Sequence, residues 1–171
     1  VGSFAGYAMT TGVKNNFIGG QAGDAITVGT RNVAVGTESL STDTQGSRSV
    51  AIGHTALFAQ NFTTATNTYN VAVGASAGGA ITTGISNTLI GGLTGDALTD
   101  ADQNVAVGNA ALGTDTLGSK STAIGTNALA DQNFTTATST YNTAVGYNAG
   151  AATTTGIQNT IVGGLAGDAL T

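Results

Sequence analysis

The sequence lacks cysteine, proline and tryptophan, and only 8% of its residues are charged. Without cysteine no disulfide can staple the fold, although this absence does not identify a cellular compartment. The low charge excludes a charged disordered chain, and so simple a composition argues against a typical enzyme. Four Lys and Arg against nine Asp and Glu give a net charge of -5. We therefore expect no nucleic acid and no direct membrane contact among the partners.

Long apolar runs are also missing. No run approaches the roughly 20 residues that are needed to cross a bilayer. The first residues show no basic stretch followed by an apolar one, as a secretory signal would. Because the chain starts at Val1 and inside a repeat, we expect it to be a window of a longer protein. Targeting signals would then lie outside this window.

Glycine is abundant, with 27 residues, and ten glycines end a recurring phrase. The phrase is Asn or Ser, any residue, usually Ala, then Val or Ile, then Gly, as in NVAVG at 32–36 and at 104–108. Three spacings of 17 positions and one of 21 make a super-repeat of 72 positions. The chain is thus one continuous array over 1–171, divided into 1–72, 73–144 and a partial copy at 145–171. The ten glycines are Gly2, Gly19, Gly36, Gly53, Gly74, Gly91, Gly108, Gly125, Gly146 and Gly163.

A repeat this short cannot enclose a core of its own, so neighbouring copies must stack and bury a shared one. The phrase alternates β-branched and small residues with a period of two, which favours strand over helix. The sequence therefore predicts an all-β fold, a parallel β-solenoid (β-roll) of ten 17- or 21-residue coils. Each coil should add one rung of about 4.7 to 4.9 Å.

The residue before each phrase glycine is always Val or Ile, and we expect this column to form the stacked core. A charged residue at Val107 or Ile124 should then destabilise the fold strongly. The residue four after the glycine alternates between Gly and Leu, and the residue seven after it alternates between apolar and polar, which indicates compensating core fillers. The Asn or Ser four before the glycine should form a polar ladder at a corner. The proposed core column is Val1, Ile18, Val35, Ile52, Val73, Ile90, Val107, Ile124, Val145 and Val162.

Two 21-residue coils carry a Thr-rich insertion, NFTTATNTYN at 61–70 and NFTTATSTYN at 133–142. We interpret each insertion as a loop that bulges from the shaft and contacts the surroundings. Asn61 and Asn133 begin N-x-T sequons, so glycan attachment there is a hypothesis. The candidate contact and glycosylation residues are Asn61, Phe62, Thr63, Tyr69, Asn133, Phe134, Thr135 and Tyr141.

The phrases NVAVG, SVAIG, STAIG and NTAVGYNAG, each followed by a coil of small residues, resemble the head repeats of YadA-type trimeric autotransporter adhesins. They are also similar to the AVG/AIG arrays in tail-fibre-like proteins of phages and marine bacteria. The resemblance covers essentially the whole chain. It implies a homotrimer of left-handed parallel β-rolls, with the Val and Ile columns internal and small residues near the trimer contact. The 17- and 21-residue coils of this chain are longer than those usual in the adhesins.

Catalytic, cofactor and metal sites are not expected. His54 is replaced by Thr126 one super-repeat later, and no nucleophile with a base, nor any multi-histidine cluster, can be assembled. The segments around Asp24, Asp96 and Asp168 resemble a calcium nonapeptide in part, but these aspartates lie four coils apart and cannot share an ion. Threonine pairs recur only every fourth coil, which makes an ice-binding face a minor alternative.

The sequence therefore predicts a non-enzymatic structural subunit of an extracellular fibre or filament shaft, located on a cell-surface appendage or virion fibre. Its main partner would be itself, as a homotrimer with repeats stacked end to end. The alternative is an adhesin head or phage tail fibre that engages host-surface glycans through its recurring loops with high multiplicity.

Overall fold

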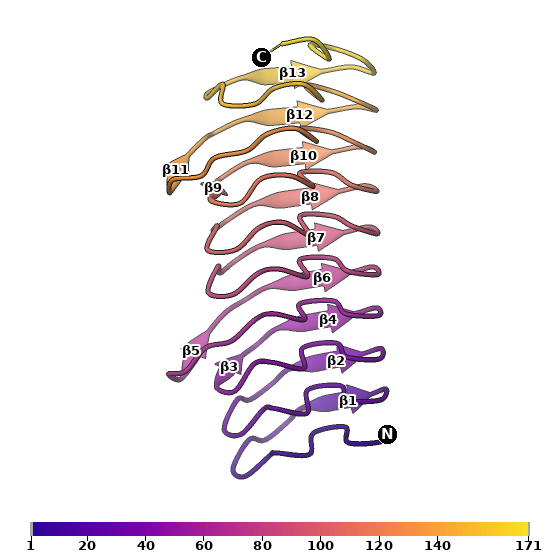
Figure 1. Cartoon of the computed structure of the whole chain (residues 1–171), viewed down its shortest axis with the longest axis vertical. Coiled ribbons are helices and arrows are strands. Elements are labelled where there is room, and N and C mark those ends of the chain that lie inside the picture. Colours follow the sequence, from indigo (N-terminus) through magenta and orange to yellow (C-terminus); the bar gives the residue numbers. More distant parts are fainter. Residues whose placement is uncertain (1, 171) are drawn as a thin grey trace.

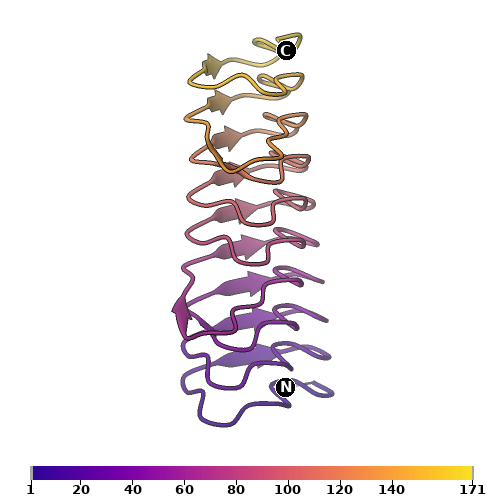
Figure 2. The ribbon, with the colours of Figure 1, turned by 60° about the vertical axis from the view of Figure 1, so that its left-hand side comes forward.

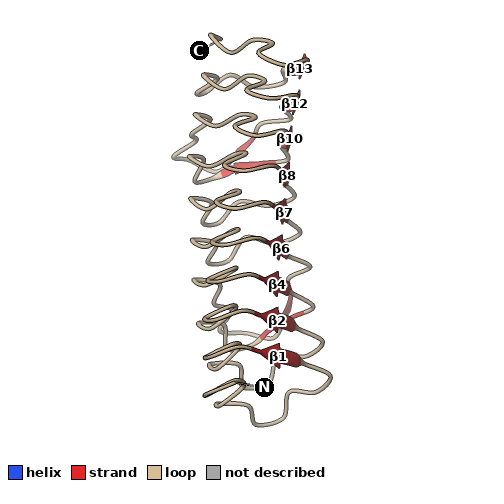
Figure 3. Cartoon of the chain, turned by 90° about the vertical axis from the view of Figure 1, so that its right-hand side faces the viewer, coloured by secondary structure: helices blue, strands red, loops and turns tan. Residues whose placement is uncertain are grey.

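The computed structural model describes residues 2–170, and within that range the chain is all β with no helix. The chain rises coil upon coil, and its two termini lie at opposite ends of the long axis (Figure 1). Nine strands, one from each coil, stack along one side of the molecule (Figure 3). The predicted parallel β-solenoid is confirmed.

The nine strands form one parallel sheet, and each pairs with its counterpart in the next coil. Ala34 faces Ala51, and Ala51 faces Ala72, so the register advances by one whole coil at each step. The first phrase glycine, Gly2, has only Val1 before it, and Val1 lies outside the described residues, so ten phrases give nine strands. The strands are β1 (Asn16–Ile18), β2 (Val33–Val35), β4 (Val50–Ile52), β6 (Val71–Val73), β7 (Thr88–Ile90), β8 (Val105–Val107), β10 (Thr122–Ile124), β12 (Thr143–Val145) and β13 (Thr160–Val162).

Each 21-residue coil also forms a short accessory sheet. β5 (Thr66–Asn67) pairs with β3 (Gly46–Ser47) of the coil below, and β11 (Thr138–Ser139) pairs with β9 (Gly118–Ser119). Figure 1 shows β5 and β11 standing out from the stack on the same side, and Figure 2 shows the same column of coils turned by 60°. The inserted segments therefore bulge outward as expected, and their backbone is paired rather than free.

The core column predicted from the sequence is wrong. In eight of the nine strands the middle residue, such as Ala51, Ala106 or Leu89, is buried, and in β1 the middle residue Phe17 is partly buried against the core. The residue before the glycine points outward, and Ile52 and Ile124 are 38% and 39% exposed. Alternation along a strand places neighbours on opposite faces, and the narrow interior of a coil accepts the small residue. Within one chain the following positions therefore lie on the outer face of the sheet: Ile18, Val35, Ile52, Val73, Ile90, Val107, Ile124, Val145 and Val162.

The interior filling follows the predicted compensation between large and small residues. Leu89 replaces the usual alanine, and a Cβ at Gly78 or Gly95 would come within 2.8 and 2.9 Å of its side chain. Gly6 and Gly23 make room for Phe17 in the same way. In the coils with a bulky strand residue a second glycine follows the phrase glycine directly, but Gly92 and Gly164 at this position have no core side chain near them and supply no such space. The glycines four residues after each phrase glycine supply the space, because they lie directly beside the bulky residue.

Left-handed backbone at fixed places turns each coil without proline. In every complete coil the residue two after the phrase glycine has positive φ, as at Thr55 with φ of 53°. Leu57 adopts φ of 50° four residues after its glycine, where other coils use glycine. Leucine is disfavoured in this region, and its complete burial in the core offsets the strain. The Gly and Leu alternation thus serves both the backbone and the packing.

The polar ladder predicted at the corner is present. Asn32 accepts a hydrogen bond on Oδ1 from the Ser49 backbone N–H at 2.8 Å and donates from Nδ2 to the Gly46 carbonyl at 2.8 Å. Asn70, Asn87 and Asn104 repeat this pattern. Each side chain satisfies a backbone amide of the next coil and a carbonyl of a turn, as buried polar groups require.

Substitutions in β8 would test which residue faces the core. Ala106→Asp places an unpaired charge in the interior and should lower the free energy of unfolding by several kcal/mol. Val107→Asp introduces the same charge on the outer face and should cost about 1 kcal/mol or less in the dilute single chain. Chemical denaturation of both variants compares them directly. Equal destabilisation would contradict this orientation of the strand.

Thr153 offers a substitution that should stabilise the fold. It occupies an interior position where other coils place Ile26, Ile81 or Leu98, and its Oγ1 is buried without a hydrogen-bond partner. Thr153→Val keeps the shape and removes the unpaired hydroxyl, which should add about 1 kcal/mol. Thr140→Val is the control, since Thr140 Oγ1 bonds to Ser121 and to the Ser119 carbonyl and its loss should destabilise. Thermal unfolding would show opposite shifts in Tm.

Candidate functional site

The most extensive feature of the surface is the outer face of the nine-stranded sheet, which we call the strand face. It consists of the first and third residues of each principal strand. The third residues are all Val or Ile, and the first residues include Val33, Val50, Val71 and Val105 and, in four other strands, Thr. The terminal residues Ile18 and Val162 are 53% and 67% exposed, and those between them are exposed or half-buried.

The strand face is long, regular and mostly apolar, since 13 of its 18 residues are Val or Ile and the other five are Thr or Asn. Nine strands at about 4.8 Å per step extend for roughly 40 Å, and two columns of side chains make it about 12 Å wide, or roughly 500 Å² in plan. An apolar patch of this size is at the upper end of what soluble monomers expose. None of the first or third strand residues is charged. A surface of this kind is suited to contact with another apolar surface.

The two loops on the 21-residue coils are only partly available for contact. Phe62 and Phe134, which were predicted as contact residues, are 7% and 8% exposed. These two predictions are wrong, because both side chains are buried in the single chain. The tyrosines Tyr69 and Tyr141 are about half exposed. The threonines that follow the phenylalanines, Thr63 and Thr135, are exposed as well.

Both exposed tyrosines have a basic neighbour. The Arg48 guanidinium lies 5.4 Å from the ring centroid of Tyr69, and the Lys120 ammonium lies 5.1 Å from that of Tyr141. Lys120 Nζ also donates to the Tyr141 hydroxyl at 3.3 Å. This hydrogen bond and the positive charge lower the pKa of Tyr141 below its ordinary 10.0. Each loop therefore presents a tyrosine held beside a cation.

The sequon asparagines are half-buried. Asn61 Oδ1 accepts a hydrogen bond from Thr44 Oγ1 at 3.3 Å, and Asn133 Oδ1 accepts one from Thr116 Oγ1 at 3.4 Å. The side-chain Nδ2 is the atom to which a glycan would be attached. Glycosylation at these sites stays a prediction.

Beneath each loop lies a buried polar network that the sequence reasoning treated only as core filling. Asp43 Oδ1 accepts hydrogen bonds from the backbone N–H of Gly46 and of Phe62, both at 3.0 Å, and its Oδ2 accepts one from Gln60 Nε2 at 2.6 Å. Gln60 in turn accepts from Asn70 at 2.9 Å. The carboxylate thus binds the first turn of the loop to the coil below it.

The same network recurs one super-repeat later around Asp115, with Gln132 Nε2 at 2.6 Å and the Phe134 N–H at 2.9 Å. Its recurrence with every partner in place shows that it belongs to the scaffold of the insertion. The sequence does contain a signal for this network. Gly46 follows Asp43 by three residues, and Gln60 occupies the same position as Asp43 one coil later.

The residues considered for chemistry are not brought together. His54 is exposed and contacts Thr55. Asp24 and Asp96 lie in different coils, and burial raises the pKa of each above 3.8. Within residues 2–170 no group of three or more His, Asp or Glu side chains could hold a metal ion. The described part of the chain also contains no helix long and apolar enough to cross a membrane.

A threonine column eight residues after the phrase glycine escaped the sequence analysis, which counted only Thr-Thr pairs. In three of four coils this residue is Thr, and its Oγ1 donates to a backbone carbonyl of the next coil, as from Thr27 to Thr44 at 3.0 Å and from Thr99 to Thr116 at 3.1 Å. Because these hydroxyl protons are used between coils, the column stabilises the stack.

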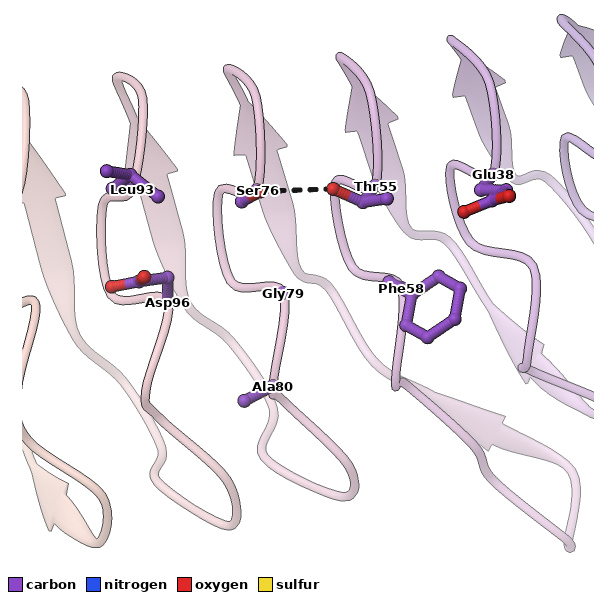
Figure 4. A pocket seen from close by; sticks show the side chains of 8 residues that line it. All are labelled: Glu38, Thr55, Phe58, Ser76, Gly79, Ala80, Leu93 and Asp96. Carbon is purple, nitrogen blue, oxygen red and sulfur yellow. Dashed lines mark hydrogen bonds between the residues drawn. The ribbon is translucent and has the colours of Figure 1, made fainter.

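One pocket of about 380 Å³ lies on a different surface, formed by the turns that follow β2, β4, β6 and β7. Seven of its eight residues form two rows, two and five positions after the phrase glycines, and Ala80 follows the second row by one position (Figure 4). Gly79 has no side chain, so it leaves a gap between Phe58 and Asp96. The lining residues are Glu38, Thr55, Phe58, Ser76, Gly79, Ala80, Leu93 and Asp96.

The buried network gives a prediction for stability. Asp43→Asn turns an amide N–H toward groups that already donate, so the free energy of unfolding should fall by about 2 to 3 kcal/mol. Asp131→Asn removes the same charge from an exposed side chain and should change stability by less than about 0.5 kcal/mol. Equilibrium denaturation of the two variants makes the comparison. Matching stabilities would show that the carboxylate is dispensable.

Comparison with known proteins found no matching family model, no matching curated protein and no matching solved structure. The function therefore has to be inferred from the surfaces of the chain itself. They are the strand face, the two tyrosine-bearing loops and the pocket beside Phe58.

Proposed function

We propose that this chain is a shaft segment of an extracellular fibre, in which copies of the solenoid pack side by side through their strand faces. The observation that carries the proposal is the nine-rung column of Val and Ile on the outer face of the sheet, five of them exposed and four half-buried. At about 25 cal/mol per Å², covering a patch of roughly 500 Å² on each copy would stabilise an assembly substantially. This gain grows with every added coil.

A homotrimer around a common axis is the simplest assembly that fits this face. Closed rings need a surface that meets its own copies by rotation, and a straight, uniform strand face allows parallel copies to stay in contact along their whole length. The resemblance of the NVAVG and SVAIG phrases to trimeric fibre proteins supports the same number of chains. In this arrangement the Val and Ile columns lie at the trimer contact and the alanines fill each solenoid.

The mechanical role follows from the repeat. Each coil bonds to the next through the parallel backbone ladder, the Asn ladder and the Thr column, so stiffness does not depend on any single contact. Length can be set by the number of super-repeats without a change in the cross-section. The absence of charge from the strand face suits a surface that is covered when copies pack together.

Multivalent adhesion is the second candidate, and the two loops favour it. Tyr69 and Tyr141 are exposed beside Arg48 and Lys120 at equivalent places one super-repeat apart. Repetition along a fibre would make weak contacts with cell-surface glycans effective together. This role would add to the shaft rather than replace it.

Mass per unit length tests the number of chains. One super-repeat of four rungs should occupy about 19 Å of axis, and light scattering or electron microscopy should give three times the single-chain mass over that length. A value for one chain would contradict the trimer and leave the strand face uncovered.

Charge on the strand face tests how the copies meet. The double variant Val73→Asp, Val107→Asp should dissociate the assembly at concentrations where the unmodified chain stays associated, because buried unpaired charges would face one another. Thr114→Asp, Thr155→Asp adds the same charge on exposed residues elsewhere and should leave assembly intact. Sedimentation velocity measures both, and circular dichroism checks that each chain stays folded. Equal dissociation of the two variants would exclude the strand face as the contact.

A further inference from the structure

All the basic residues of the chain lie in one column of the solenoid, one position before the Asn or Ser of the polar ladder. The Arg31 backbone N–H donates to the carbonyl of Val13, the residue before Lys14, at 3.1 Å. Arg48 repeats this bond to the Thr30 carbonyl at 3.0 Å, so the first three bases follow one another coil by coil. We call these three residues the basic tract. The basic members of the column are Lys14, Arg31, Arg48 and Lys120.

The fold does not require a base in this column. One and two super-repeats later Lys14 is replaced by Ser86 and Gln158, and Arg31 is replaced by Gln103. The uncharged residues keep the same backbone, with φ of 59° to 60°, against 60° to 67° for the bases. The turn and the register are therefore indifferent to the charge, which leaves the basic tract free for a role outside the fold.

The charges of the tract are exposed and are not neutralised by the chain. Lys14 and Arg31 are exposed, and within residues 2–170 neither side chain has an ion pair or hydrogen bond. Asp24 and Glu38 come after their strands, at the opposite end from the bases, and Asp43 is buried. With a Debye length of about 8 Å at physiological ionic strength, the tract presents local positive charge on a chain of net charge -5.

An aromatic ring continues the tract into the next coil. Tyr69 occupies the same column, is 51% exposed, and its ring centroid lies 5.4 Å from the Arg48 guanidinium. The short strands β3 and β5, which precede Arg48 and Tyr69 in the chain, pair with each other along one edge of the stack (Figure 1). From Lys14 to Tyr69 the column rises by three rungs, or about 14 Å along the axis.

We infer that the basic tract and Tyr69 bind a linear anionic polysaccharide that lies along the solenoid axis. Successive sugars of an extended glycan repeat at about the distance of one rung, so acidic groups on neighbouring sugars can pair with bases in successive coils. The Tyr69 ring offers a flat apolar surface to the C–H face of the next sugar. The phosphates along a strand of duplex DNA repeat every 3.4 Å or so and match the rungs less well.

The inference deepens the second candidate function, adhesion to glycans, by naming the class of glycan. It rests on the single chain and does not depend on the homotrimer. The second super-repeat provides an internal comparison, because it carries Ser86 and Gln103 in place of two bases and has the carboxylate of Asp102 directly before Gln103.

A hexamer of galacturonate, with one carboxylate on each sugar, is the probe for the test. Titrated at low salt into the ¹⁵N-labelled 171-residue chain, it should shift the amide signals of the basic tract and Tyr69 saturably, with a Kd of about 1 mM. The equivalent amides of Ser86, Gln103 and Gln158 should not move. Added salt should weaken the binding, because exposed ion pairs are screened. The neutral hexamer of maltose should bind at least about tenfold more weakly.

Two double variants separate the tract from the net charge. Lys14→Ser, Arg31→Gln introduces the residues that the second super-repeat already uses, so it should leave the Tm unchanged and weaken binding at least about fivefold. Thr114→Asp, Thr155→Asp lowers the net charge by the same amount outside the tract and should leave the affinity unchanged.

The ring is tested in the same way. Tyr69→Ala should weaken binding about threefold, because the sugar loses its apolar contact. Tyr141→Ala is the matched control, since Tyr141 has the same place and a similar exposure one super-repeat later, beside a single base.

Three results would overturn the inference. Equal weakening by the two double variants would reduce the effect to net charge. Equal affinity for the galacturonate and maltose hexamers would show that the acidic groups are not recognised. A thymidylate hexamer that shifts the same amides and binds more tightly than galacturonate would assign the tract to nucleic acid. Sedimentation velocity of Lys14→Ser, Arg31→Gln should match that of the unmodified chain, which distinguishes lost glycan binding from failure of the proposed assembly.

Discussion

The backbone ladder between successive coils is the constraint on which the rest of the structure depends. A rung spacing of about 4.8 Å leaves no room for a side chain at the phrase glycines. A Cβ at Gly36 would overlap the carbonyl oxygen of Gly53, and the same holds from coil to coil. Every other column is then fixed in register, because one residue per coil must lie directly above its counterpart. Insertions can enter only where the chain loops outward.

Stacking in register makes each column a separate packing problem. Interior columns have to fill a narrow cross-section, so Leu89 requires glycine at 78 and 95. Polar columns have to satisfy backbone groups, as Asn32 does for Ser49. Where the fourth coil carries its insertion, Ser49 takes the ladder position and bonds to Thr68 at 2.5 Å, and Asp43 and Gln60 hold the loop from beneath. The super-repeat of four coils is therefore the unit in which these demands are met together.

Much of this could be predicted from the sequence, because the regular return of the phrase glycine is visible without a structure. The parallel ladder, the polar corner and the exchange of volume between columns all followed from it. The orientation of the strands, that is, which of their two faces points to the interior, could not be predicted from this repeat. Alternation in VAV shows that Val and Ala face opposite sides but not which side is inside, and here both faces are apolar. The pocket also escaped, since it depends on how the left-handed turns place Phe58 and Asp96, 38 positions apart, on one surface with Gly79 between them.

The outward orientation of the Val and Ile residues in the strands bears on assembly. Sequence patterns report which positions avoid water, and Val107 and Ile124 carry that signal as strongly as any interior residue. In the single chain they lie on the outer face of the sheet, and in the proposed assembly a neighbouring copy would bury them. A solenoid this narrow closes its own interior with alanine, leucine and a few isoleucines. In the proposed assembly, the Val and Ile residues of the strand face would be covered by a neighbouring copy. Surface columns such as that of Phe58 and Ala130 neither fill the interior nor belong to the strand face. Their residues can therefore differ from one super-repeat to the next.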